Sequence, residues 1–208
     1  KAGKTGIGGI AINGSDLWLV YLNSRSLVKV DISDISLLPT NGSAIAAGLV
    51  TEYPINAQAC TDGVFRPFAI QFEDGVGYIG GVCTAENVAD RSNRSNLDGY
   101  VYSFDPSVGA LTFTEVLNID FDYTREKSRQ NPGTSTPEVG DWRPWASTWA
   151  QIDDNTITPS FIQSAHPAYP QPIISSLAFT ESGSMVIGVM DRWGNQTGAN
   201  NRIAVSQT

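Results

Sequence analysis

Three copies of one pattern constrain the fold of this chain more than any other feature: an apolar segment, a short polar turn and a second apolar segment. The copies run over residues 8–21, 67–80 and 176–188. A small residue holds the same place in each, at Ala11, Ala69 and Ala178, with separations of 58 and 109 residues. The second separation is close to twice the first. An antiparallel hairpin repeated at roughly 40 to 55 residues is typical of β-propeller blades.

Further apolar segments extend each hairpin. Residues 26–32 alternate like a half-buried strand, and residues 49–54 indicate an outer strand. We therefore expect an all-β, β-propeller-like repeat of antiparallel four-stranded blades in one domain. The blades are expected at about 8–54, 66–118 and 173–208, with an irregular insertion at about 124–171.

The number of expected blades raises a problem of closure. About three are visible and the third is incomplete, whereas closed propellers need roughly four to eight. An open arc would leave apolar surface and strand edges exposed. The chain is thus expected to belong to a larger propeller or to pack against copies of itself. A single-domain β-sandwich with irregular loops is the alternative fold.

The charge and composition exclude some classes of partner. The net charge is −8, with 13 Lys and Arg against 21 Asp and Glu, so a nucleic-acid backbone would be repelled. No apolar run approaches the length of about 20 residues that spans a bilayer. Charged residues make up only 16% of the chain, and this composition favours a secreted or cell-surface protein.

The two cysteines flank the second hairpin. Cys60 precedes its first strand and Cys83 ends its second. In a secreted protein such a pair predicts one disulfide, worth roughly 3 kcal/mol. Two buried free thiols are the alternative. No Cys-x-x-Cys spacing supports zinc or thioredoxin-type chemistry.

The glycines near the N-terminus do not form a nucleotide-binding motif. Lys4 and Thr5 follow Gly3, but the strand comes after the lysine rather than before it. We interpret these glycines as turn residues. The lone histidine, His166, lies in the proline-rich insertion, and no Gly-x-Ser-x-Gly elbow accompanies it. A Ser-His-Asp site is therefore not indicated.

Carboxylates offer a candidate metal site. Asp120 and Asp122 alternate on an expected strand, so both side chains would share one face. Asp191 lies where the third hairpin runs into a loop. Such groups could bind Ca²⁺, the one cofactor that the sequence suggests, or act as an acid/base pair. The alternative is a solvated turn or a salt bridge to a nearby arginine.

Tryptophan and arginine side chains in the insertion and after the third hairpin form a candidate binding platform. Stacking and polar contacts of this kind suit carbohydrate or peptide ligands. The alternative role is packing in the core or over one end of the sheets. The residues are Trp142, Arg143, Trp145, Trp149, Arg192 and Trp193.

Several segments resemble one group of proteins. They are residues 6–11, 17–23, 66–69, 80–86 and 191–198. These segments are similar to the N-terminal propeller-like region of large bacterial surface proteins that carry SdrD B-like (Cna-B-type) repeats, although the repeats themselves are absent from these 208 residues. The resemblance implies an extracellular, multidomain surface protein. It implies no established activity, so no functional residue is carried over from it.

These observations favour a non-enzymatic extracellular or cell-surface module for structure or adhesion. Its expected partners are other surface proteins, glycans or copies of itself. The alternative is a propeller-type hydrolase, lactonase-like or glycan-cleaving, with a metal or carboxylate site. An enzyme should bring several carboxylates to one pocket, whereas a surface module should scatter them.

Overall fold

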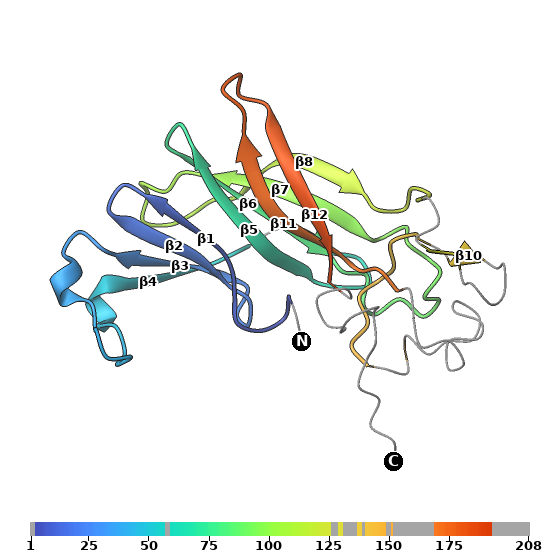
Figure 1. Ribbon diagram of the computed structural model, residues 1–208, viewed down its shortest axis with the longest axis horizontal. Helices are drawn as coiled ribbons and strands as arrows, with labels where there is room; N and C mark the ends of the chain where they lie inside the picture. Colours follow the sequence, from blue (N-terminus) through green and yellow to red (C-terminus); the bar gives the residue numbers. More distant parts are fainter. Residues whose placement is uncertain are drawn as a thin grey trace, which may run out of the picture.

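The computed structural model describes residues 3–56, 59–125, 129–130, 137–138, 140–148, 151 and 169–192. Within these residues the fold is all-β, with two short 3-10 turns (Figure 1). The prediction of antiparallel four-stranded sheets is confirmed. None of the sheets closes into a barrel, and the propeller stays a prediction.

Two four-stranded sheets each follow chain order. The first sheet is β1 (Ile7–Asn13), β2 (Asp16–Tyr21), β3 (Ser26–Asp31) and β4 (Val50–Pro54), with turns η1 (Ile35–Leu37) and η2 (Ala47–Leu49) before β4. The second sheet is β5 (Phe65–Glu73), β6 (Val76–Cys83), β7 (Asp98–Phe104) and β8 (Thr114–Asp120). All neighbours in both sheets are antiparallel, so each sheet is a simple meander.

The third hairpin forms a separate two-stranded sheet. It consists of β11 (Pro172–Phe179) and β12 (Met185–Asp191). A small ribbon pairs β9 (Arg129–Gln130) with β10 (Pro137–Glu138). The remaining part of the expected third blade, including Trp193, lies outside the described residues.

The three layers pack face to face, with the second sheet in the middle. The first strands of the two sheets and of the third hairpin lie side by side: β5 contacts β1 on one side and β11 on the other (Figure 1). One apolar cluster fills the space between the first and second sheets, around Trp18 of β2. The Trp18 ring lies 5.7 Å from the rings of both Phe72 and Phe104. The second sheet thereby buries one face against the first.

A second apolar cluster covers the other face of the middle sheet. It joins Val82 and Val101 of that sheet to Ile173 and Ile174 of β11. Strands β5 to β7 of the middle sheet are thus covered on both faces, which explains the nearly continuous apolar sequence of β6, whereas the edge strand β8 is exposed. Trp145, from the irregular segment, also belongs to this cluster.

The glycines of β1 do not serve as turn residues, contrary to our interpretation of the sequence. Gly3 and Gly6 have positive φ values of 71° and 93° and do form a turn. Gly8 and Gly9 instead lie inside β1, against the backbone of β5. A Cβ on Gly8 would lie 2.8 Å from the carbonyl oxygen of Phe68. These two glycines allow the first and second layers to approach closely.

Candidate interaction surfaces and pocket

The outer face of the first sheet is apolar, and it is open at the β1 edge, whereas Val30 of β3 on the same face is 3% exposed. Strand pairing places Ile10 beside Leu19 and Ile12 beside Leu17 on the face away from Trp18. The side chains of Ile10 and Ile12 are 58% and 64% exposed. We call this surface the open face, defined by Ile10, Ile12, Leu17, Leu19 and Val28. Contiguous exposed apolar surface of this kind marks interaction sites.

The hairpin repeat shows why the open face is unusual. The residues beside Ala69 and Ala178 correspond to those beside Ala11. Ile70, the counterpart of Ile12, is 6% exposed and packs toward the first sheet. Leu177, the counterpart of Ile10, is also 6% exposed and packs toward the second sheet. The equivalent positions are therefore covered in both later copies, whereas Ile10 and Ile12 are exposed in the first.

In the third hairpin the exposed face is the one that points away from the second sheet. Ala178 pairs with Val186 on the side away from the second sheet. Val186 is 56% exposed. In the first two units the corresponding positions, Ala11 and Ala69, pack against the next layer. The stack of described layers thus ends in two exposed faces, which are opposite faces of the repeated hairpin: the open face of the first sheet and the Val186 face of the third hairpin.

Four of the predicted binding residues are buried. Trp142, Arg143, Trp145 and Arg192 are 5%, 9%, 1% and 4% exposed. These positions agree with the packing alternative that the sequence left open. The other two predicted residues, Trp149 and Trp193, lie outside the described residues, as does His166.

Specific contacts fix Trp145 and Arg192 in place. The indole nitrogen of Trp145 donates to the carbonyl of Pro172 over 2.8 Å. The Arg192 guanidinium lies 4.6 Å from the centre of the Trp145 ring and donates to the side-chain oxygen of Gln171. Burial lowers the pKa of Arg192 to about 10. These contacts connect the end of β12 to the irregular segment at 140–148.

Sequence reasoning missed the structural role of Arg91. The polar stretch from Glu86 to Asn96 connects β6 to β7 and has the composition of an exposed loop, but Arg91 is 5% exposed. Its guanidinium donates to the carbonyls of Pro144 and Trp145, both over 2.8 Å, and to the Tyr169 hydroxyl. A polar stretch has no periodicity that could reveal such a buried side chain. The arginine joins this loop to the segment at 140–148.

The three predicted metal ligands lie at the ends of two different strands, β8 and β12. Asp120 ends β8, so Asp122 lies beyond the strand rather than on it. Between them Phe121 is 1% exposed and packs against the Trp142 ring. Asp191 ends β12, where its carboxylate accepts a hydrogen bond from the backbone of Gln171.

No group of three or more His, Cys, Asp or Glu side chains in the part of the chain that the structure describes could hold a metal ion. The calcium site stays a prediction.

An unpredicted pair of carboxylates faces across β7 and β8. Asp98 pairs with Asp120 in the strand register. Burial, together with the charges of Asp120 and Asp122, raises the pKa of Asp98 to about 6. The sequence alone does not give the cross-strand register, so this juxtaposition was not foreseen. Asp98 is therefore a carboxyl group that titrates near neutral pH.

The predicted disulfide is confirmed. Cys60 bonds to Cys83 with their Cα atoms 5.4 Å apart. Cys83 is the last residue of β6, and Cys60 lies in the linker between β4 and β5. The bond therefore fastens this linker to the middle sheet.

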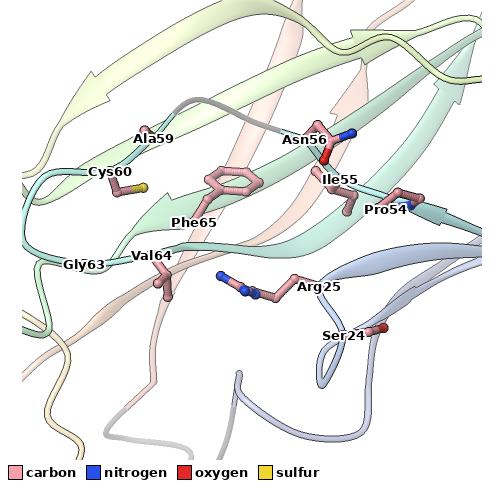
Figure 2. Close-up of a pocket in the computed structure, with 10 residues that line it drawn as sticks. All are labelled: Ser24, Arg25, Pro54, Ile55, Asn56, Ala59, Cys60, Gly63, Val64 and Phe65. Atoms are coloured by element: carbon pink, nitrogen blue, oxygen red, sulfur yellow. The ribbon is translucent and has the colours of Figure 1, made fainter.

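A pocket of about 440 Å³ lies beside that linker (Figure 2). Its walls come from the turn between β2 and β3, the end of β4 and the residues that lead into β5. Apolar lining is provided by Ile55, Val64 and Phe65, and polar groups by Ser24, Arg25 and Asn56. Figure 2 shows the Arg25 guanidinium extending toward Val64 below the Phe65 ring. The volume lies within the range of small-molecule sites.

Comparison with known proteins shows a distant similarity to a much longer protein. No family model matches the chain. It is 29% identical to Colossin-A of Dictyostelium discoideum over 195 residues, which are 93% of this chain and 2% of Colossin-A. The chain therefore spans about one fiftieth of the length of that relative. The bacterial origin implied by the sequence resemblance stays a prediction. No helix in the described part of the chain is long and apolar enough to cross a bilayer.

Proposed function

We propose that this chain is a non-catalytic module of an extracellular or cell-surface protein, with a structural or adhesive role. The observation that carries the proposal is the open face, where Ile10 and Ile12 are more than half exposed. A sheet face of this composition is suited to packing against another sheet. The partner is a further sheet, supplied by another surface protein or by a second copy of the chain.

Two other observations support the proposal. The Cys60–Cys83 disulfide fits an oxidising compartment, because such bonds are rare in the cytosol. The match to Colossin-A extends over nearly all of this chain but only 2% of that much longer protein. A chain that matches so small a share of a much longer protein is suited to be one module among many. In this proposal the exposed loops contact glycans.

We propose that these surfaces belong to a propeller-like arrangement. Two meandering sheets and a hairpin stack in series with their first strands at the centre. Further blades would cover the open face at one end of the series and the Val186 face at the other. In this proposal the module functions as a rigid scaffold whose partners attach at uncovered faces and loops.

Bead aggregation and sedimentation velocity test this function. Beads coated with the chain should cluster, and the free chain should associate reversibly as its concentration rises. Ile12→Lys should abolish both effects, since it places a charge in the open face. Ile35→Lys is the matched control, because Ile35 is 76% exposed in η1 outside that face. Absence of clustering and of association up to the solubility limit would exclude a second copy of the chain as the partner.

A further inference from the structure

The pocket in Figure 2 combines one cation with apolar walls and contains no acidic lining residue among those described. Arg25 supplies the cation. Its guanidinium has no hydrogen-bond or ion-pair partner within the described ranges, although the net charge of the chain is −8. Glu52 of β4 accepts hydrogen bonds from Ser24 and Ser26 rather than from Arg25. Arg25 is exposed, and a guanidinium is weakly hydrated and matches the geometry of a carboxylate, so it can pair with an anionic ligand beside this apolar surface.

The backbone holds Arg25 in a conformation that few long side chains adopt. Its φ is 58°, in the left-handed region that favours glycine or asparagine. The backbone amide of Ile55 donates to the Arg25 carbonyl over 3.4 Å, which ties the turn to the far wall of the pocket. Residues held in this region cluster at binding and active sites. The turn therefore retains an arginine at a position where glycine would be less strained.

Apolar side chains form most of the remaining pocket wall and favour an apolar body in the ligand. The Phe65 ring packs edge-on to Tyr102 with centroids 5.5 Å apart, so it is a rigid wall. Ile55 and Val64 extend the apolar surface, and the Cys60–Cys83 bond holds the linker against the sheet. Asn56 and Ser24 offer neutral hydrogen-bonding groups. The pocket thus has one charged contact and room for a body of moderate size.

We propose that this pocket binds a carboxylate carried on a small apolar or aromatic body, with Arg25 pairing to the carboxylate. A guanidinium matches a carboxylate through two parallel N–H···O hydrogen bonds. A phosphate would favour several cationic groups, and the described lining contains one. The proposal is independent of the open face, which lies on other side chains of the first sheet.

Titration with 3-phenylpropionate, followed by amide chemical shifts of the whole chain, tests the proposal. The acid should shift the amides of Ser24, Arg25 and Asn56 saturably, with a dissociation constant on the order of 1 mM for about 11 non-hydrogen atoms. Its neutral analogue, 3-phenylpropionamide, should bind at least about tenfold more weakly, because it lacks the charge. Equal binding of acid and amide, or no saturable shift, would overturn the proposal.

Variants of Arg25 separate recognition from folding. Arg25→Gln should weaken the acid about tenfold and leave the amide unchanged, while Arg25→Lys should retain part of the affinity. Lys29→Gln removes the same charge from β3 outside the pocket and should leave binding unchanged. Ile12→Lys, which tests the proposed function, should also leave it unchanged. Acid binding that survives Arg25→Gln in a folded chain would refute the role of Arg25.

The source of the carboxylate requires a second comparison. A free small acid and the C-terminus of a peptide share the same chemistry. A short peptide that ends in phenylalanine should bind more tightly than 3-phenylpropionate if the pocket recognises chain ends, and its C-terminal amide should not compete. Equal or weaker binding of the peptide would assign the pocket to small carboxylates. Failure of both probes would overturn the site and leave the open-face proposal untouched.

Discussion

Gly9 of β1 lies so close to β5 that a Cβ on it would be 2.9 Å from the backbone nitrogen of Ile70. Contacts this short do not occur with real Cβ atoms, and the neighbouring group is backbone that cannot rotate away. The first and second sheets can therefore approach each other at this point only because residue 9 lacks a side chain.

Gly9→Ala should lower the free energy of unfolding by about 2 kcal/mol, because it overpacks the junction between the two layers. Chemical denaturation measures the change. Gly48→Ala is the control, since a Cβ there meets nothing within 4 Å and its backbone has no positive φ. A Gly9→Ala variant as stable as the control would show that β1 and β5 are not so closely packed.

The repeated hairpins and the cysteine spacing could be predicted because both are local signals. The alternation of apolar residues identified β1, β2, β5, β6, β11 and β12, and the flanking positions of Cys60 and Cys83 identified the disulfide. The role of Gly9 could not be predicted in the same way. Its sequence neighbours resemble those of a turn, and the reason for glycine lies in β5, about 60 residues away.

The candidate site was harder to foresee than the fold. Trp145 and Arg192 were recognised as unusual, but residue type alone could not decide between a binding platform and a buried cluster. Arg91 gave no signal at all, because its partners are carbonyls of a segment more than 50 residues later. Arg25 gave none either, since neither a positive φ nor the pocket beside it is encoded in a local pattern.

Replacing both cysteines by serine should destabilise the chain by about 3 kcal/mol under oxidising conditions, as expected for a closed loop of this length. The Cα atoms lie 23 positions apart in sequence. Thermal melting with and without a reductant measures the effect. The reductant should lower the melting temperature of the unmodified chain and leave the double serine variant unchanged. A reductant-insensitive unmodified chain would argue against the bond in solution.

Asp98→Asn should change the pH dependence of stability. The pKa of Asp98 is raised to about 6 from 3.8, so the folded state holds its proton more tightly than the unfolded state. This contribution is greatest below about pH 4 and is lost as pH rises through about 6. Asparagine cannot ionise, so Asp98→Asn avoids the cost of the charged carboxylate at high pH. It should stabilise the chain at pH 7.5 by at most about 1 kcal/mol, after allowance for solvent screening.

Denaturation at a series of pH values measures this effect. The Asp98→Asn and unmodified chains should differ above pH 6 and converge near pH 4. Glu115→Gln provides a control on β8, because Glu115 is exposed and pairs with Tyr102 rather than Asp98. A difference between Asp98→Asn and the unmodified chain that is constant with pH would contradict the raised pKa.

Arg91→Ala should lower the free energy of unfolding by about 3 kcal/mol, because it leaves two buried carbonyls without their donor. Hydrogen exchange should show increased opening of residues 140–148. Arg94→Ala is the matched control. Arg94 forms a 3.6 Å ion pair with Asp141 near the surface, and its loss should cost less than about 1 kcal/mol. Equal costs for the two variants would contradict the buried role of Arg91.

Arg25→Gly should stabilise the fold by about 0.5 kcal/mol, because glycine adopts a φ of 58° without the steric cost that an arginine carries. The same change should weaken carboxylate binding in the pocket at least about tenfold, because the guanidinium is lost. Parallel denaturation and titration measure the two effects. Gain of stability with loss of binding would identify a residue retained for recognition, whereas loss of both would indicate that Arg25 supports the turn itself.

The Cys60–Cys83 bond also limits how far the molecule can be stretched. It encloses β5 and β6, the first two strands of the middle layer. When the chain is pulled from both ends, these residues cannot contribute to its contour length. At about 3.4 Å per residue, the withheld length is about 75 Å. A surface protein built from such modules would therefore extend less under load in an oxidising medium than in a reducing one.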